Sequence, residues 1–413
     1  MKVLLVNKFH YKRGGSETYY FALKEGLERA GHEVIHFAMK HEKNIPCAQE
    51  KYFVDNIDYV GKSSKLQQLK QAVKLIYSFE AKKKFEQLIK DERPDVVHMN
   101  LVHRQITLSI VDVCNKYKIP VVFTAHDLVC CCPAGSLLTS SREYCRRCYG
   151  GNYCNCIKNK CIKGSFSKSL AACIEATFYR IHRSYNKIDA FITPSGFYKK
   201  EIEKSGITKN PIYHMANFLP ADTVYACTDS QKYFLFLGSL TKDKGVFTLL
   251  KAFHQAKLEG WKLVYAGRGP EFERMQDYIE EHQLEDIVNM LGFVTGEQLR
   301  KVTQSAYAVV LPSECNENGP YALMEPMASG KPVIGARIAG IPELAIPGRT
   351  GWLFETGNVV DLAEALKQVV KTDAEEYKKL SEGACEFARE HLSMEQYIKK
   401  LETIYLNLIG ENK

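Results

Sequence analysis

Two carboxylates in the C-terminal half of the chain, Glu317 and Glu325, stand at a spacing that could serve chemistry. Seven residues separate them, and the segment 311–344 around them joins the apolar run SAYAVV to the apolar run KPVI. A Gly-Pro step between the two glutamates marks a helix start, because proline is well tolerated in a first helical turn. We therefore expect Glu317 in the loop at the helix N-terminus and Glu325 roughly one and a half turns inside the helix.

Acidic side chains beside a helix N-terminus suit a ligand that carries both hydroxyl groups and phosphate. The unpaired N–H groups and the positive dipole of a helix start bind phosphate, and carboxylates accept hydrogen bonds from hydroxyls. In sheets of parallel strands, ligands bind in the crevice at the carboxyl ends of the strands. The pattern indicates a nucleotide-sugar site, although an exposed helix with a capping glutamate would place the same two residues in sequence.

The wider segment resembles the donor-site signature of glycosyltransferase family 4, the retaining enzymes with two Rossmann-like domains in the GT-B architecture. Glu317 and Glu325 match the two glutamates of that signature, and MASGKPVI (327–334) matches its continuation. The resemblance implies that Glu317 contacts the transferred sugar. It also implies that Glu325 holds the ribose hydroxyls of the nucleotide.

Two positions of the signature differ from the family pattern, which has glycine at both. Asn318 and Pro320 stand there, and proline offers no N–H to a phosphate. Donor contacts in this turn are then expected from Gly319, Tyr321 or Ala322, with Asn318 beside them.

The segment FLGSLTKDKGVFTLL also resembles the family, at the turn that opens its second domain. Lys244 matches the lysine that neutralises the donor diphosphate, but Ser239 stands where the family usually has arginine. Lys242 or Arg268 could supply the missing cation, because lysine acts as a point charge without fork geometry.

Two further candidates lie in the N-terminal half. His126, in VVFTAHDLVC, ends a predicted strand and coincides with the active-site histidine of the family; the alternative is a loop histidine beside a capping Asp127. Gly14 and Gly15 follow the first predicted strand and would permit close backbone approach to a ligand. The family uses this loop to meet the donor diphosphate and the acceptor, while a tight structural turn would need the same glycines. It is no GxGxxG fingerprint, so a dinucleotide is not indicated.

The resemblance implies chemistry in which no side chain attacks the sugar. The nucleoside diphosphate leaves, and the acceptor hydroxyl arrives on the same face, so catalysis rests on positioning and on stabilising the leaving phosphate. Lys244 and the helix start at Gly319 would supply that stabilisation, with Glu317 on the sugar and His126 on the acceptor side. The sequence has no Asp-x-Asp motif, so we expect neither a catalytic metal nor another catalytic cofactor.

Short apolar runs alternate with helical patterns along the chain, which predicts parallel sheets with crossover helices. Twelve runs read as strands, six in each half: KVLLVN, EVIHFAM, DVVHMN, PVVFTAH, DAFITP and PIYHM, then YFLFLGS, WKLVYAG, IVNMLGF, YAVVLPS, KPVIGA and TGWLF. We predict an α/β protein with two Rossmann-like domains (GT-B) facing a central cleft. The domains are expected at 1–216 (acceptor side) and 217–385 (nucleotide-sugar side), with a C-terminal helix, 386–413, that crosses back.

The bulk composition is that of an ordinary globular protein with a net charge of +8. No run of eighteen apolar residues and no signal peptide is evident, so we expect a cytoplasmic protein.

The lysine-rich segment 63–95 carries apolar residues at helical spacing, among them Leu66, Leu69, Val73 and Phe85. It predicts a packed helix with a solvated lysine face; the alternative is adhesion to an anionic membrane, which would make the protein peripheral. Nucleic-acid binding is not indicated.

Eight of the fourteen cysteines fall between Cys130 and Cys161. The set Cys145, Cys148, Cys156 and Cys161 has spacings that favour structural zinc in a cytosolic protein, with Cys132 and Cys154 as competing ligands. Unligated or redox-active thiols are the alternative. Some polysaccharide-type members of the family are similar here, with a Cys-rich insertion that would occupy about 128–164 and shape the acceptor side.

The main hypothesis is a glycosyltransferase that moves a sugar from a nucleotide-diphosphate donor to a glycan or lipid-linked acceptor in cell-surface polysaccharide biosynthesis. The alternatives are another GT-B enzyme of nucleotide sugars, such as an epimerase, and a non-catalytic zinc- or redox-responsive protein on a transferase scaffold. The joint presence of Lys244, Glu317, Glu325 and His126 favours the transferase.

Overall fold

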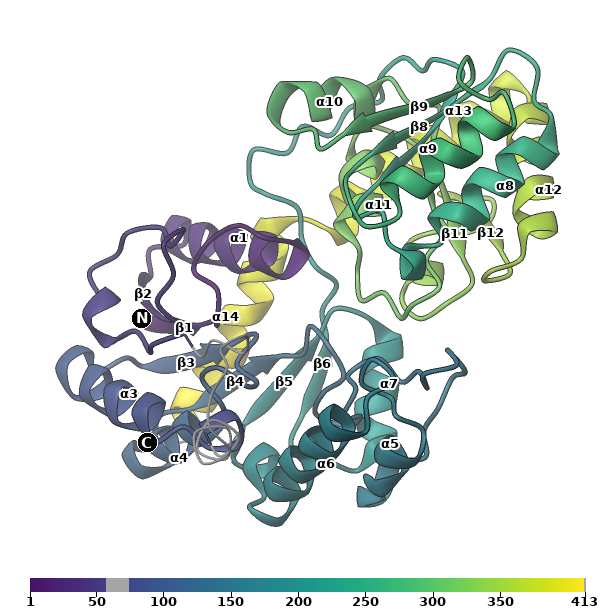
Figure 1. Cartoon of the computed structure of the whole chain (residues 1–413). Coiled ribbons are helices and arrows are strands. Elements are labelled where there is room, and N and C mark those ends of the chain that lie inside the picture. The colour runs from purple at the N-terminus through teal and green to yellow at the C-terminus, as the bar shows by residue number, and fades with distance from the viewer. Residues whose placement is uncertain (57–73, 412–413) are drawn as a thin grey trace. The chain divides into compact units, whose positions relative to one another are not determined.

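The computed structural model describes residues 1–56 and 74–411, and the chain divides into two compact units (Figure 1). The N-terminal unit comprises 1–215 together with the C-terminal segment 394–413, and the C-terminal unit comprises 216–393. Each unit contains one sheet of six parallel strands covered by helices. The prediction of two Rossmann-like domains is confirmed.

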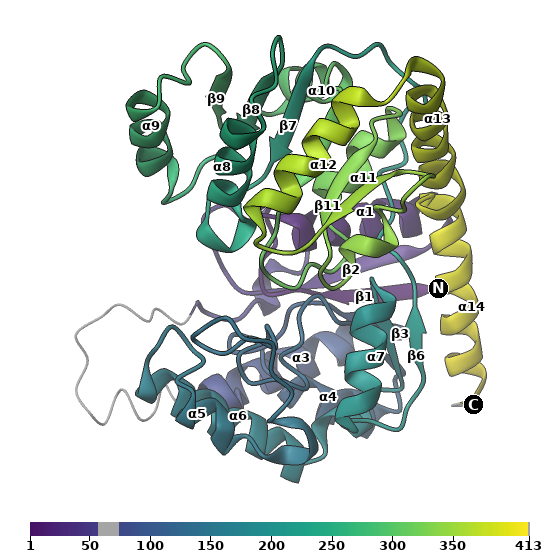
Figure 2. The ribbon, with the colours of Figure 1, turned by 90° about the vertical axis from the view of Figure 1, so that its right-hand side faces the viewer.

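The N-terminal unit has the strand order β2-β1-β3-β4-β5-β6, with every neighbouring pair parallel. Its strands are β1 (Lys2–Val6), β2 (Glu33–Phe37), β3 (Val96–Met99), β4 (Val121–Thr124), β5 (Ala190–Thr193) and β6 (Ile212–His214). Its helices are α1 (Gly15–Arg29), α3 (Phe79–Glu92), α4 (Ser109–Tyr117), α5 (Cys154–Lys158), α6 (Phe166–Ile181), α7 (Gly196–Ser205) and α14 (Met394–Glu411), with 3₁₀ turns η1 (Glu50–Tyr52), η2 (Tyr149–Gly151) and η3 (Ser184–Lys187). Figure 2 shows α5 and α6, which pack on each other, at one edge of this unit.

The C-terminal unit has the strand order β12-β11-β10-β7-β8-β9, again with all neighbouring pairs parallel. Its strands are β7 (Tyr233–Leu237), β8 (Lys262–Ala266), β9 (Val288–Gly292), β10 (Ala308–Leu311), β11 (Val333–Ala336) and β12 (Gly351–Phe354). Its helices are α8 (Val246–Ala256), α9 (Phe272–Glu281), α10 (Gly296–Gln304), α11 (Tyr321–Ala328), α12 (Val359–Lys371) and α13 (Ala374–His391), with 3₁₀ turns η4 (Lys242–Lys244) and η5 (Ile341–Glu343). This order is that of the Rossmann fold.

All twelve predicted strands are present. The central strands are recognisable because a parallel strand covered by helices on both faces is apolar along its whole length. In β1 and β10, for example, the residues from Val3 to Val6 and from Ala308 to Leu311 are buried. Such continuous apolar runs stand out in a sequence, and the loops after β1, β4, β7, β8 and β10 carry the candidate residues.

The order of the strands reverses at one point in each sheet, and these points position the candidate loops. In the C-terminal unit the reversal lies between β7 and β10, which are hydrogen-bonded neighbours. In the N-terminal unit it lies between β1 and β3. The loops after such strands run in opposite directions and leave a crevice at the carboxyl edge, where ligands bind in these folds.

The C-terminal tail differs from the single helix predicted for 386–413. Helix α13 continues to His391 as part of the C-terminal unit, and only α14, from Met394, belongs to the N-terminal unit. Tyr405 on α14 lies with its hydroxyl 2.5 Å from Nδ1 of the buried His98, which ties α14 to strand β3. Residues 386–393 were assigned wrongly because the amphipathic pattern runs on through the break between the two helices.

The lysine-rich segment 63–95 is described only from residue 74. Leu66, Leu69 and Val73 lie outside the described residues, whereas Phe85 on α3 is buried against the sheet as predicted. Within the described part of the chain, no helix is both long and apolar enough to cross a bilayer.

Candidate functional site

Lys244 and Glu317 meet in an ion pair at the carboxyl edge of the C-terminal sheet. Lys244 ends the 3₁₀ turn η4 after β7, and Glu317 lies in the loop between β10 and α11. The ammonium nitrogen of Lys244 is 2.5 Å from Oε1 of Glu317, and the two side chains are 29% and 12% exposed. Burial alone would lower the pKa of Lys244, but the charges of Glu317 and Cys315 raise it overall. The lysine is therefore a fixed cation.

The surrounding loop holds Glu317 in place through its own polar groups. Ser313 donates a hydrogen bond from its hydroxyl to the same oxygen, Oε1, over 2.6 Å, and the backbone carbonyl of Glu317 accepts from Gly340 N–H. Glu314, also in this loop, accepts from the hydroxyl of Thr248 on α8. The carboxylate of Glu317 is thus oriented before any ligand binds.

The glycine that follows Lys244 is required by the backbone. Gly245 has φ +66° and caps both η4 and α8, and a Cβ atom there would lie 1.9 Å from the carbonyl oxygen of Pro312. Only glycine combines a left-handed conformation with so close an approach of two loops. This contact brings the β7 loop, with Lys244, against the β10 loop.

Glu325 lies on α11, and its carboxylate makes no hydrogen bond or ion pair with any described residue. Its side chain reaches solvent, yet protein atoms gather densely around it, and this desolvation raises the pKa of its carboxyl group. An unpaired carboxylate with a raised pKa is the kind of group that a functional site retains.

The turn between the two glutamates starts α11 as predicted. Pro320 is the N-cap residue and Gly319 has φ +74°. The side-chain amide of Asn217 donates to the carbonyl of Gly319 over 3.0 Å and lies 3.5 Å from that of Asn318. The hydroxyl of Tyr321 donates to the carbonyl of Phe218, so Tyr321 is a structural residue in this state. The N–H groups of Gly319 and Ala322 have no partner among the described residues and are the open donors at this helix start.

Ser239 and Arg268 follow β7 and β8 and are both exposed. Arg268 borders a cavity of about 600 Å³, which is also lined by Gly269, Met290 and Leu291. Its guanidinium forms no ion pair among the described residues, and it lies beside Gly292, whose added Cβ would be 3.5 Å from Nε of Arg268. The position of Arg268 is compatible with the predicted role of a second phosphate cation.

The N-terminal unit holds His126 just after β4, next to Asn100 just after β3. Nε2 of His126 is 3.0 Å from Oδ1 of Asn100, and the ring packs edge-on against Tyr19 at 4.9 Å between centroids. Burial lowers the pKa of His126 to about 4, although Asp127 acts in the opposite direction. The imidazole is therefore neutral at physiological pH, able to donate or accept a hydrogen bond but carrying no charge.

Gly14 and Gly15 begin α1 in the loop after β1. Gly14 is the N-cap residue in an extended conformation, and its carbonyl accepts from the N–H groups of Glu17 and Thr18. A Cβ on Gly14 would meet only Glu17, at an ordinary 3.8 Å. Neither the backbone conformation nor packing inside this unit demands glycine at Gly14, which leaves room for a ligand as the reason for it.

Two basic residues at the same edge of the N-terminal sheet, Lys8 and Arg104, were not predicted as site residues. Lys8 follows β1, Arg104 follows β3, and burial lowers the pKa of Lys8 despite the opposing charge of Asp127. Arg104 lies 3.4 Å from the buried Glu175 of α6. Each of these residues stands within a few positions of the carboxyl end of a strand, and this position in the sequence could have identified it as a candidate. Which loops lie next to one another depends on the strand order, which the sequence pattern does not give.

The cysteine-rich region contains free thiols. Cys148 and Cys156 are buried in a small apolar cluster with Cys173, while Cys145 and Cys161 are partly exposed. Burial raises the pKa of Cys156 and Cys161, so both are protonated thiols in this state. Among the described residues, which include all four predicted ligands, no group of three or more His, Cys, Asp or Glu is arranged to hold a metal ion. The zinc site receives no support from this arrangement and stays a prediction.

Comparisons with known proteins agree with this geometry. A sequence profile described as Glycosyltransferase Family 4 matches residues 13–222, more than half of the chain, and one described as Glycosyl transferases group 1 matches residues 224–387. The chain is 30% identical over 203 residues to N-acetyl-alpha-D-glucosaminyl L-malate synthase of Bacillus anthracis (49% of this chain and 52% of the relative). It is 36% identical over 141 residues to the putative colanic acid biosynthesis glycosyltransferase WcaL of Salmonella typhimurium (32% and 35%).

The matched parts span about half or less of these two curated relatives. Among solved structures, the Anabaena protein HepE in complex with UDP and glucose superimposes with a TM-score of 0.67 at 15% identity, over 98% of this chain and 100% of HepE. At that identity the likeness concerns the fold.

Proposed function

The chain belongs to glycosyltransferase family 4, and from that premise we propose that it transfers a sugar from a nucleotide-diphosphate donor to a glycan or lipid-linked acceptor. The observation that carries the proposal is the Lys244–Glu317 pair at the reversal of the strand order, beside the unpaired carboxylate of Glu325. A cation, an oriented carboxylate and a free carboxylate at one sheet edge match the three polar parts of such a donor: diphosphate, sugar and ribose.

In the proposed donor complex, Lys244 contacts the diphosphate, and the open N–H groups of Gly319 and Ala322 add two further donors. These groups stabilise the negative charge that grows on the leaving phosphate, because they are fixed before the reaction and need no reorganisation. Glu317 holds hydroxyls of the transferred sugar with the oxygen that Ser313 leaves free. Glu325 accepts hydrogen bonds from the ribose hydroxyls.

The nucleobase has a candidate position next to Arg268. The cavity of about 600 Å³ at this point is lined partly by Met290 and Leu291, and Phe293, just beyond β9, is 69% exposed. Exposed aromatic and aliphatic side chains beside a cavity suit a flat, partly apolar ring. We place the base against Leu291 and Phe293, with Arg268 turned toward the phosphates.

The transfer proposed is retaining and independent of a divalent metal. Lys244 and the helix start at Gly319 supply positive charge at the diphosphate, which is the part that a metal plays in other phosphate chemistry. Neutral His126, in the N-terminal unit, orients the acceptor by a hydrogen bond. The acceptor belongs to polysaccharide biosynthesis, by analogy with the name of the WcaL relative.

The first experiment is a thermal-shift screen with UDP, GDP and ADP, followed by their sugars. A ligand that binds the folded state raises the melting temperature as its concentration exceeds Kd. We expect one nucleotide diphosphate to stabilise the wild type and to act weakly on Glu325→Ala and Lys244→Met. No stabilisation by any of the three would count against a nucleotide-sugar site.

A second comparison separates the base from the phosphates; here and below, UDP and uridine stand for the nucleoside diphosphate that the screen selects and for its nucleoside. Leu291→Ser is expected to weaken UDP and uridine equally, since both carry the base, whereas Lys244→Met is expected to weaken UDP alone. An equal loss for both ligands in Lys244→Met would show that this lysine does not bind the diphosphate.

A further inference from the structure

One face of helix α6 in the N-terminal unit is apolar and exposed over the whole length of the helix. Phe166, Leu170, Ile174 and Ile181 are 57%, 37%, 49% and 78% exposed. At 100° per residue these four positions fall within one quarter of the helix surface. We call them the α6 face. The opposite side of the helix, with Ala172 and Tyr179, is buried in the unit.

The α6 face is more than a set of isolated apolar side chains. Soluble proteins expose single large apolar residues routinely, but a contiguous apolar stripe generally marks a binding surface. Ser167, Ala171 and Thr177, which also point outward, add no charge to it. A stripe of four large side chains without an interrupting charge therefore requires a partner that is itself apolar at the contact.

The sequence before and within helix α6 is rich in positive charge. Residues 140–183 contain nine lysines and arginines but only two acidic residues, a surplus of seven within a chain of net charge +8. One of the acidic residues, Glu175, is buried and paired with Arg104. Lys158, Lys160, Lys163 and Lys168 are exposed, and none of them forms an ion pair with a described residue.

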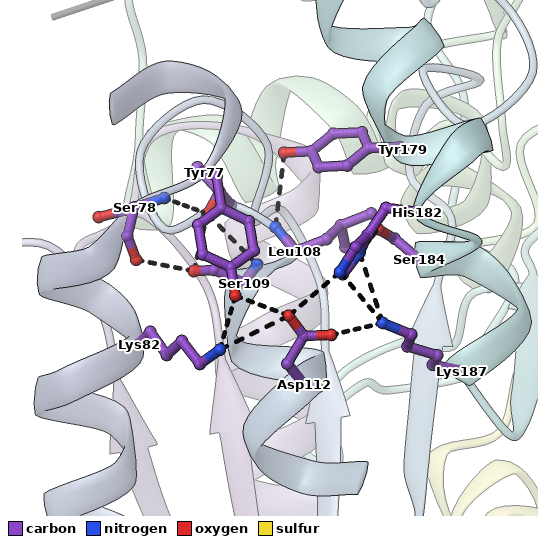
Figure 3. A network of polar contacts seen from close by, with 11 residues as sticks. Tyr77, Ser78, Lys82, Leu108, Ser109, Asp112, Tyr179, His182, Ser184 and Lys187 are labelled. Carbon is purple, nitrogen blue, oxygen red and sulfur yellow. Dashed lines mark hydrogen bonds and ion pairs between the residues drawn. The ribbon is translucent and has the colours of Figure 1, made fainter. Parts of the chain in front are cut away.

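Polar contacts hold α6 so that its apolar face stays outward. Just after the helix, His182 lies 3.6 Å from the carboxylate of Asp112 on α4, and Lys187 bonds the same carboxylate over 2.6 Å (Figure 3). Tyr77 donates to Asp112 from its hydroxyl over 2.7 Å. With the Arg104–Glu175 pair in the middle of the helix, these contacts fix its rotation about its own axis.

The same anchor brings a further exposed aromatic residue to the end of the α6 face. The ring of Tyr77 lies 5.1 Å from that of Phe79 and 5.8 Å from that of Phe178 on α6. Phe79 is 70% exposed. The apolar surface therefore extends beyond α6 onto the start of α3.

We propose that the α6 face, with Phe79 and the lysines at the start of the helix, docks the protein on an anionic lipid bilayer surface. Apolar side chains would enter the boundary between headgroups and acyl chains, while the lysines meet the anionic headgroups, as in interfacial amphipathic helices. A second copy of the chain is a poorer occupant, because it would bring two sets of like-charged lysines together. The lysine-rich segment 63–95 need not supply the membrane contact.

Vesicle flotation tests this proposal without reference to sugar transfer. The full chain is mixed with vesicles of phosphatidylcholine alone or with phosphatidylglycerol, and the bound fraction is measured. We expect binding to the anionic vesicles only. Lys160→Glu/Lys163→Glu is expected to weaken it at least about 25-fold, since each well-placed lysine contributes about fivefold and reversal removes more than its attraction.

Ile174→Asp/Ile181→Asp is expected to abolish binding, and Val360→Asp/Leu406→Asp is the matched control. Val360 and Leu406 are similarly exposed, at 63% and 58%, but lie on α12 and α14. The control is expected to bind like the wild type. Stabilisation by UDP, measured in parallel, reports on the proposed donor site and should be the same in all variants.

Two results would overturn the docking surface. One is unchanged vesicle binding of Ile174→Asp/Ile181→Asp. The other is light scattering that shows the wild type as a dimer and this variant as a monomer, because the α6 face would then be covered by a second copy.

Discussion

Replacement of Lys244 by methionine tests whether this lysine binds the diphosphate of the donor. Methionine keeps the length and apolar stem of the side chain and removes only its charge. A hydrogen bond to a charged group contributes about 1.5–3 kcal/mol, so the loss of Lys244 should weaken UDP binding roughly 10- to 100-fold. Uridine lacks the diphosphate, and its affinity should not change.

The same substitution should destabilise the C-terminal unit only moderately. With side chains 29% and 12% exposed, the Lys244–Glu317 pair lies between a surface pair, worth under about 1 kcal/mol, and a buried one, whose breakage costs about 3–5 kcal/mol. Ser313 continues to donate to the carboxylate. We expect a loss of about 1–2 kcal/mol, which leaves the protein folded for titration.

Isothermal titration of UDP and uridine into the wild type, Lys244→Met and Lys378→Met supplies the comparison. Lys378 on α13 is 73% exposed and pairs only weakly within the described residues, with Glu382 at 3.8 Å, so its variant controls for the loss of a positive charge. Unaltered UDP affinity in Lys244→Met would refute the assignment. So would an equal loss in Lys378→Met, because the effect would then be one of net charge.

Three further outcomes are expected. The raised pKa of Glu325 implies that, as the pH is lowered, UDP affinity begins to fall at a higher pH than it would with an ordinary carboxyl group, because protonation weakens the carboxylate as an acceptor for the ribose hydroxyls. Glu325→Gln should bind weakly with no such slope in titrations at several pH values. Gly245→Ala should lower the free energy of unfolding by about 3 kcal/mol in urea titrations, since it combines a positive φ with a collision against Pro312. His98 is fully buried, which lowers its pKa to about 3, whereas its pKa in the unfolded state is 6.5. The unfolded state therefore binds the proton first, and the free energy of unfolding decreases as the pH falls below 6.5, by about 2 kcal/mol at pH 5. His98→Gln should make the melting temperature less dependent on pH in thermal melts.

The strands and the identity of the main site residues could be predicted because both follow from local sequence. A buried parallel strand must be apolar throughout, and the residues that serve a ligand stand directly after such runs. Glu317 and Glu325 belong to one continuous segment, so their positions before and within helix α11 could be predicted.

The pairing of those residues could not be predicted from the residues alone. Lys244 and Glu317 are separated by 73 positions, and their contact exists because β7 and β10 are adjacent at the reversal of the strand order. Asn100 beside His126 depends in the same way on β3 and β4 being neighbours. Strand order is set by packing of the whole sheet, which no local pattern encodes.

Two features of the helices could not be predicted, because periodicity does not show what an apolar helix face packs against. The tail from 386 onward has one continuous amphipathic pattern, although α13 and α14 belong to different units. The apolar side chains at positions 166, 170, 174 and 181 have the spacing of an ordinary core stripe, yet they point outward. Periodicity shows that a helix has an apolar face, but it does not show whether the rest of the protein covers that face or leaves it exposed.

The central claim is that Lys244, Glu317 and Glu325 form a donor site for sugar transfer. NMR observation of a nucleotide sugar that the thermal-shift screen has selected tests it most directly, with an acceptor extract and the purified protein. The claim predicts release of free nucleoside diphosphate together with a new glycosidic anomeric signal, both absent in Glu317→Gln. A sugar that changes while it remains joined to the nucleotide, or equal release by the wild type and Glu317→Gln, would contradict it.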